Sequence, residues 1–348
     1  MIRNGHFDLR RAGMSLLLAA VVPLAWAGDA GLQFTHHDWT LACDNTLACR
    51  AAGYQRDGDA LAVSVLLTRP AGAGTAVTGR VMLGQYEESP LPAGLALQID
   101  GRDEGAVDLD IREGHAPLAP AQVAVLVEAL ARDADIAFVG DDGQRWQLSD
   151  RGGAAVMLKM DEIQGRLGTP GALLRKGERD EAGVLPPRPA PSIRVAPLEP
   201  LRPDDHALLA DPHLRGALQA SLSGEDCEGL QPGQWDESWG LVRLDDAHVL
   251  VSVRCWMAAY NEGYGYWVTS DAPPYRPRLV TTSGSWSDGA IIDASQKGRG
   301  LGDCWWHASW AWDGREFVQA SEYTTGMCRL VAAGGAWVLP TLVTELVQ

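Results

Sequence analysis

The sequence predicts a mainly β (α+β) protein with two domains, and three observations carry this prediction. Apolar and polar residues alternate over many short segments, which is the period of half-buried strands. A proline-rich stretch (184–203) carries seven prolines in twenty residues and interrupts this pattern. Six cysteines, an even number, suit a β framework held by disulfides. We expect a β-sandwich-like domain with a packed helix (30–178), a proline-rich linker (179–204) and a tryptophan-rich, disulfide-stapled antiparallel β domain (205–348).

Residues 1–27 have the features of a cleaved export signal. Three arginines precede a short apolar run, MSLLLAAVVPL (14–24), and Ala25 and Ala27 supply the small residues that signal peptidase recognises. Eleven residues are too few to cross a bilayer. We therefore expect cleavage before Gly28, export to the periplasm or beyond, and no stable membrane insertion afterwards.

Charge narrows the choice of partners. The formal net charge is −16, and it becomes −18 without residues 1–27, which contain three arginines and one aspartate. An acidic surface repels phosphate backbones, so the sequence argues against nucleic acid. An envelope protein, or a polar or glycan ligand, remains as the expected partner.

The cysteines are expected to be structural. All six follow the export signal: Cys43, Cys49, Cys227, Cys255, Cys304 and Cys328. Of the fifteen possible pairings we favour the sequential one, because it keeps one bridge within the first half. The two cysteines at 43 and 49 enclose five residues, which is too long for a redox CxxC motif and suits a stapled hairpin.

Local patterns predict the elements of the first domain. Helical spacing of four apolar residues after Pro120 predicts a helix that reaches Leu130, and a shorter helix is expected around 159–167. Strands are expected at LAVSVLLT (61–68), GLALQID (94–100) and AVDLDIR (106–112).

Asp142-Gly143 predicts a two-residue hairpin turn near the end of the first domain. Such a turn sets Val139 opposite Trp146, and the residue at 137 opposite the one at 148.

The second domain is expected to open with a helix near 204–221 and to continue as strands. Ten of the thirteen tryptophans lie in this domain. The expected strands are WGLVRL (239–244), AHVLVSVRCW (247–256), YGYWVTS (264–270), GAIIDAS (289–295), CWWHASWAW (304–312), REFVQASEY (315–323) and AWVLPTLV (336–343).

The stretch KGRGLGDCWWHASWAWDG (297–314) holds the candidate site. A two-residue turn at Asp313-Gly314 would place Trp305 and His307 on one sheet face with Glu322, and would make His307 and Glu322 diagonal neighbours. These three side chains could hold a polar ligand by stacking and hydrogen bonding. The alternative is an exposed His–Glu pair beside a half-buried tryptophan.

The glycine-rich loop KGRGLGD (297–303) is expected to form the rim of this site, with Arg299 directed at the ligand. The alternative is a solvated turn in which Arg299 contacts Asp303. A strand follows the loop, so it lacks the strand–loop–helix setting of a phosphate-binding motif.

Other groups of polar residues in the sequence identify no catalytic residue, metal site or cofactor site. Cys304 and His307 are three residues apart on one strand and therefore point to opposite faces, which excludes a thiolate–imidazole pair. The cluster DDHALLADPH (204–213) resembles a metal site, but Pro212 separates its histidines. Carboxylates are plentiful, and no particular acid–base pair is indicated.

Several of these residues together resemble a known family. DWTLACDNTLACRAAGY (38–54), the proline-rich middle, the stretch at 297–314 and six cysteines look like the bacterial family called domain of unknown function 1176. The resemblance covers essentially the whole exported chain and implies an exported bacterial protein with six characteristic cysteines. The first half is also similar to the invasion-associated locus B family, which implies a β-sandwich there. Neither resemblance supplies catalytic residues.

Three functions remain open. We favour a soluble periplasmic binding or interaction protein, because aromatic residues are abundant and no catalytic set is assembled. An envelope hydrolase that cleaves glycan or peptide with a carboxylate pair is the second hypothesis. A purely structural envelope factor is the third, and it predicts no concave aromatic site.

Overall fold

The computed structural model describes residues 31–84, 91–110, 112, 114–222, 227–233 and 239–348. The expected export signal (1–27) lies outside this part of the chain. The prediction of a mainly β fold is confirmed, with few helices and several antiparallel sheets. Within the described residues, no helix is long and apolar enough to span a membrane.

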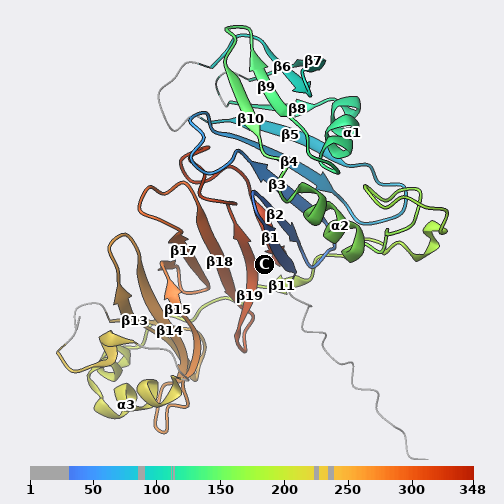
Figure 1. Cartoon of the computed structure of the whole chain (residues 1–348). Helices are drawn as coiled ribbons and strands as arrows, with labels where there is room; N and C mark the ends of the chain where they lie inside the picture. The colour runs from blue at the N-terminus through green and yellow to red at the C-terminus, as the bar shows by residue number, and fades with distance from the viewer. Residues whose placement is uncertain (1–30, 85–90, 111, 113, 223–226, 234–238) are drawn as a thin grey trace, which may run out of the picture.

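The first half contains two sheets (Figure 1). A six-stranded sheet has the order β1-β2-β3-β4-β5-β8, and a four-stranded sheet has the order β10-β9-β6-β7. The strands of the six-stranded sheet are β1 (Leu32–His36), β2 (Trp39–Cys43), β3 (Cys49–Tyr54), β4 (Val63–Arg69), β5 (Thr78–Leu83) and β8 (His115–Leu118). Those of the four-stranded sheet are β6 (Leu95–Ile99), β7 (Arg102–Val107), β9 (Ile136–Gly140) and β10 (Arg145–Leu148).

A single core joins these sheets to two helices, α1 (Pro120–Ala129) and α2 (Gly153–Ile163). Trp39, Leu97 and Phe138 are fully buried in it. Helix α1 confirms the helix predicted after Pro120. The second helix begins six residues before the predicted start and ends earlier, because Gly165 takes the left-handed conformation that stops a helix.

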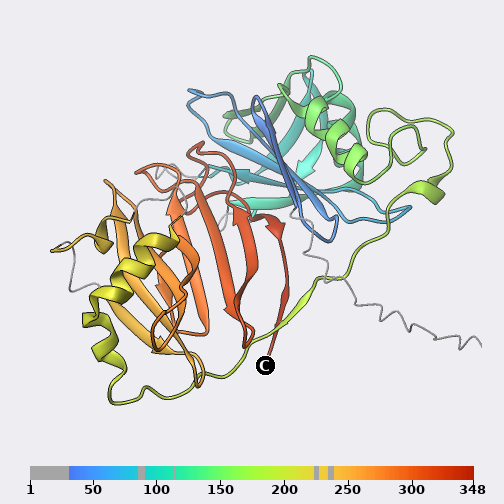
Figure 2. The same cartoon turned by 90° about the horizontal axis from the view of Figure 1, so that it is seen from below.

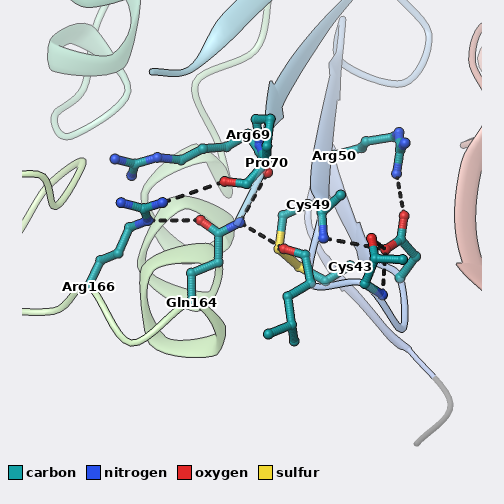
Figure 3. Close-up of a disulfide and its surroundings, with 11 residues drawn as sticks. Cys43, Cys49, Arg50, Arg69, Pro70, Gln164 and Arg166 are labelled. Carbon is teal, nitrogen blue, oxygen red and sulfur yellow. Dashed lines mark hydrogen bonds and ion pairs between the residues drawn. A yellow bond between two sulfur atoms is a disulfide. The ribbon is translucent and has the colours of Figure 1, made fainter. Parts of the chain in front are cut away.

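Polar side chains beyond α2 fasten this helix to the β2–β3 hairpin (Figure 3). Cys43 lies directly opposite Cys49 and is bonded to it, as the sequence suggested. Gln164 donates from Nε2 to the carbonyl oxygens of Leu47 and Arg69, at 2.9 and 3.0 Å. The hairpin is therefore held both by its disulfide and by the end of the helix.

Two details of the first half differ from the predictions. The strand expected at 106–112 overlaps β7 only at residues 106 and 107, because β7 ends at Val107. The turn at 142 contains three residues, because Gly140 pairs with Gln144 and Gly143 is left-handed. Val139 therefore lies opposite Arg145, one residue from the predicted partner.

The second half contains a four-stranded sheet, β12-β13-β14-β15, and a five-stranded sheet, β16-β17-β18-β19-β20. The first consists of β12 (Gly240–Arg243), β13 (His248–Met257), β14 (Glu262–Ser270) and β15 (Arg278–Gly284). The second consists of β16 (Trp286–Ser287), β17 (Ile291–Lys297), β18 (Trp305–Trp312), β19 (Phe317–Thr324) and β20 (Leu339–Leu342). The seven strands predicted here are confirmed, and β15 and β16 were not predicted.

The two sheets of the second half enclose a core that includes Leu250, Ile292 and Trp312. On its other face, the β12–β15 sheet is covered by α3 (Pro212–Ser221) and the short helix η3 (Glu228–Leu230). The disulfides Cys227–Cys255 and Cys304–Cys328 complete the sequential pairing that the sequence favoured.

The proline-rich segment is extended and packed. Its strand β11 (Ser192–Arg194) pairs in parallel with the last strand, β21 (Glu345–Val347). Ile193 is buried against Ala311 and Ala320 of the five-stranded sheet. Figure 2 shows this segment running along one side of the second half. The linker therefore covers one end of that sheet.

The two halves share a buried interface. Residues 325–342 lie on the face of the six-stranded sheet that points away from the first core, and Trp337 is buried there beside Tyr54 and Leu339. The Trp337 Nε1 donates to Ser64 Oγ at 2.7 Å. The orange-red strands of the five-stranded sheet accordingly lie between the first half and the β12–β15 sheet (Figures 1 and 2).

A buried ion pair fixes the start of the second half. Arg243 on β12 and Asp205 in the short helix η2 (Asp205–Ala210) form a two-point contact, and both side chains are less than 5% exposed. The guanidinium of Arg243 holds the pKa of Asp205 at about 2. Asp271 supplies a second carboxylate oxygen 3.1 Å from Arg243.

We predict that Asp205→Asn lowers the free energy of unfolding by about 3 kcal/mol, because it leaves a buried guanidinium without its main counter-charge. Urea unfolding at pH 7 measures this loss. Because the folded pKa of Asp205 lies below its usual value of 3.8, the wild-type contribution is present above about pH 4 and is lost as the pH falls toward 2. The exposed neighbour control, Asp204→Asn, should be neutral; an equal loss in both variants would contradict the prediction.

Candidate functional site

One face of the five-stranded sheet carries a grid of polar side chains, which we call the polar face. Along β17, apolar Ile292 and Ala294 point into the core, so Asp293 and Ser295 point to the other side. Directly opposed residues of neighbouring strands share a face, which extends the grid across β18 and β19. The polar face consists of Asp293, Ser295, His307, Ser309, Ser321 and Tyr323.

Two rows cross the polar face. In the first, the Ser295 Oγ lies 2.8 Å from the His307 Nδ1, and the imidazole stacks on the Tyr323 ring with 4.6 Å between ring centroids. In the second, the Ser309 Oγ and Ser321 Oγ are 2.7 Å apart. All of these side chains are half-buried. The rows therefore present hydroxyl and imidazole groups side by side.

Trp305 lies on the same side of the sheet as His307, as predicted, but its ring faces are already occupied. Its indole stacks on His307 at 5.9 Å between centroids, and the Lys297 Nζ lies 5.4 Å above the Trp305 ring. The Trp305 Nε1 donates to the carbonyl oxygen of Gly302 at 2.9 Å. Trp305 thus supports His307 and does not offer an open stacking surface.

Trp286 offers the open indole that Trp305 lacks. It lies directly opposite Asp293, which places it beside the polar face, and it is 55% exposed. The sequence analysis did not include Trp286 in the site.

The predicted grouping of Glu322 with Trp305 and His307 is wrong. The turn lies one residue further along than predicted: the Asp313 N–H donates to the Glu316 carbonyl oxygen at 3.1 Å, which leaves Gly314 and Arg315 between them, and Trp312 pairs with Phe317. The Asp313 carboxylate accepts hydrogen bonds from the backbone N–H groups of Arg315 and Glu316. This turn alone would leave each side chain of β19 on its predicted face of the sheet, because it shifts the register by two residues.

A bulge then reverses the faces of the upper part of β19. An extra residue, Ala320, stands between the partners of Ser309 and Trp310. Tyr323 therefore replaces Glu322 beside His307. Glu322 points into the space between the sheets, where it accepts a hydrogen bond from the Trp306 Nε1 at 3.1 Å.

Arg299 also lies outside the polar face. Its guanidinium donates to both carboxylate oxygens of Asp303, at 2.8 and 2.5 Å, which is the contact that the sequence analysis gave as the alternative. Asp303 is buried. The loop contributes Lys297 and not Arg299 to the border of the polar face.

Burial controls the electrostatics of the polar face. It lowers the pKa of His307 below the usual 6.5, and the nearby Asp293 carboxylate opposes this shift. Burial raises the pKa of Asp293, with a further contribution from the Asp288 carboxylate. At neutral pH the imidazole is therefore uncharged and can both donate and accept a hydrogen bond.

Apart from the polar face, one group of possible metal ligands lies at the end of the 297–303 loop in the described part of the chain. Asp303, Cys304 and Cys328 bring their ligand atoms within 4.8 Å of one another. The two sulfur atoms are bonded to each other, and Asp303 is paired with Arg299. With its thiols oxidised, this group cannot supply the thiolate ligands that a metal site of this kind needs.

Five residues of the polar face were missed from the sequence: Asp293, Ser295, Ser309, Ser321 and Tyr323. The alternation in GAIIDAS (289–295) contained a usable signal, because it sets Asp293 and Ser295 on one side of the strand. Which side of the strand faces away from the core could be decided only from the packing of the two sheets. To place Ser321 and Tyr323 on this side, the bulge in β19 had to be known as well.

The titration of His307 tests this geometry. We predict an NMR titration midpoint for His307 below 6.5, and a further decrease in Asp293→Asn, which removes the carboxylate that raises this pKa. Glu322→Gln serves as a control, since it removes a carboxylate on the opposite face and should leave the midpoint unchanged. A larger effect of the Glu322 change would restore the original grouping.

Comparison with known proteins places this chain in a family. The model of the family described as "Protein of unknown function (DUF1176)" matches residues 33–344. The chain is 27% identical over 351 residues to the "Uncharacterized protein YpfG" of Escherichia coli (strain K12), with 94% of this chain and 97% of that protein covered. No solved structure matches the chain. The chain belongs to the DUF1176 family.

Proposed function

We propose that the protein is an exported binding protein of the bacterial periplasm, and that its polar face holds a neutral polar ligand such as a glycan segment. One observation carries the proposal: three serine hydroxyls, a tyrosine, an uncharged imidazole and a carboxyl group gather on one half-buried sheet face beside an exposed tryptophan.

The chemistry of the polar face suits sugar hydroxyls. Serine hydroxyls and neutral imidazole donate and accept hydrogen bonds, so they can match hydroxyl groups in several orientations. The open face of Trp286 can stack on the apolar face of a sugar ring, while Asp293 directly opposite accepts a hydrogen bond. A broad sheet face suits an extended chain better than a compact molecule.

The disulfides and the N-terminal sequence support the proposed compartment. Three disulfides fit a protein that folds outside the cytoplasm. Residues 1–27 have the composition of a cleaved export signal.

We predict that protein expressed with residues 1–27 and purified from the periplasm starts at Gly28 and takes up no alkylating reagent before reduction. Intact-mass spectrometry measures both properties. After reduction, six alkyl groups should be added. Retention of residues 1–27, or a free thiol before reduction, would contradict the proposed export.

Binding to the polar face can be tested with N-acetylchitotetraose and isothermal titration calorimetry. We predict that Trp286→Ala weakens binding at least tenfold, about 1.4 kcal/mol, because it removes the stacking surface. Ser309→Ala should also weaken binding, since it removes the hydroxyl group, and with it one hydrogen bond, without adding bulk.

Tyr260→Ala is the matched control, because Tyr260 is an aromatic residue outside the polar face with 46% exposure. It should leave binding unchanged. Equal effects of Trp286→Ala and Tyr260→Ala, or no binding by the wild type, would reject glycan binding at this face.

A hydrolase is the second candidate, and the raised pKa of Asp293 favours it. A carboxyl group whose pKa is raised by burial is better suited to act as a general acid toward a glycosidic oxygen than an ordinary carboxylate. Asp293→Asn separates the two functions: in a hydrolase it abolishes product formation, whereas in a binding protein no product forms in either variant.

A further inference from the structure

A cleft of about 340 Å³ lies where the two halves meet. This volume falls within the usual range of small-molecule sites, which often occur between domains. The first half contributes residues of the loop that follows β3, and the second half contributes the segment that follows Cys328. The residues used below are Asp57, Asp59, Leu61, Leu91, Trp146, Arg299, Arg329 and Leu330.

The floor of the cleft is apolar. Leu61 and Leu91 pack against the core of the first half, and Trp146 belongs to that core. Leu330 approaches from the second half with 38% of its surface exposed. A ligand with an apolar body would cover the exposed parts of Leu61, Leu91 and Leu330 and remove them from water.

The backbone at Leu330 is held in an unfavourable conformation. Leu330 has a φ of 56°, in the left-handed region that non-glycine residues rarely adopt. Three consecutive contacts impose it: the disulfide of Cys328, the ion pair of Arg329 with Asp38, and the hydrogen bond from the Leu330 N–H to Asp303 at 2.8 Å. Strain that the surroundings enforce in this way is typical of binding sites.

The charges around the cleft do not balance. Arg299 is paired with the buried Asp303, and Arg329 with the buried Asp38 at 2.9 Å. These two pairs neutralise both guanidinium groups. The Asp57 and Asp59 carboxylates remain in the lining, and the exposed Asp57 lies 3.4 Å from Arg329. The described lining and its ion-pair partners thus carry four carboxylates and two guanidinium groups.

We propose that this cleft is a second binding site, separate from the polar face, and that it takes a small organic cation with an apolar body, such as an arylalkyl amine. The apolar body lies on Leu61, Leu91, Trp146 and Leu330. The ammonium group lies toward the excess negative charge of Asp57 and Asp59. An acidic cleft with low-dielectric walls concentrates cations at its mouth.

Three probes that share a phenyl group and carry a positive, a neutral and a negative head group test the proposal on the full exported chain. Phenethylamine, 2-phenylethanol and phenylacetate are compared by calorimetry and by chemical-shift changes at Trp146. We expect phenethylamine to bind at least tenfold more tightly than phenylacetate, with 2-phenylethanol between them. The preference for the amine should weaken at high salt, because both carboxylates are accessible to counter-ions.

Variants locate the site. The double variant Asp57→Asn, Asp59→Asn should lose the preference for the amine over the alcohol and keep the affinity for the alcohol. Asp133→Asn removes an exposed carboxylate outside the cleft and should change nothing. Tighter binding of phenylacetate, absence of amine binding, or an unchanged preference in the double variant would overturn the proposal.

Discussion

The docking of residues 325–342 on the six-stranded sheet is the interaction on which the rest of the structure depends. Trp337 enters the space between the halves and is anchored by Ser64, while Tyr54 accepts a hydrogen bond from the Met327 N–H at 3.2 Å. Further along, the Asn45 side chain bonds both to the N–H and to the carbonyl oxygen of Val343. The six-stranded sheet is thereby covered on both faces, by its own core on one side and by the second half on the other. The two halves are therefore connected in two ways, by the proline-rich segment and by the buried interface.

This arrangement also positions both candidate sites. Cys304 lies just before β18 and Cys328 lies within the docked residues, so their disulfide joins the strand of the polar face to the segment that forms the interface. The five-stranded sheet packs one face on the β12–β15 sheet, and the linker covers only the end of the other face around Ala311. The polar rows above that end stay accessible. The cleft lies at the edge of the interface, where the pinned residues 328–330 meet the loop of Asp57.

Much of the fold could be predicted from the sequence, because alternation and helical spacing are local signals. Helix α1 and seven strands of the second half followed from such signals, and the sequential disulfides from the even number of cysteines and their division between the halves. The register of β18 and β19 could not, because it depends on hydrogen bonds of the Asp313 side chain and on a bulge at Ala320. The bulge moved Glu322 to the face opposite His307. The interface between the halves could not be predicted either, because its residues Tyr54, Ser64 and Trp337 are far apart in the chain and no periodic pattern connects them. The cleft depends on that interface and was therefore beyond prediction.

Native-state hydrogen exchange, followed by mass spectrometry at increasing urea, tests the central role of the interface most directly. The measurement compares the free energy of opening for residues 325–342 with that for β3 and β4 of the six-stranded sheet. We expect equal values, because the docked segment and the sheet that it covers unfold together. Exchange of residues 325–342 at a much lower free energy, with β3 and β4 still protected, would show that the halves are joined only by the linker and would contradict the account.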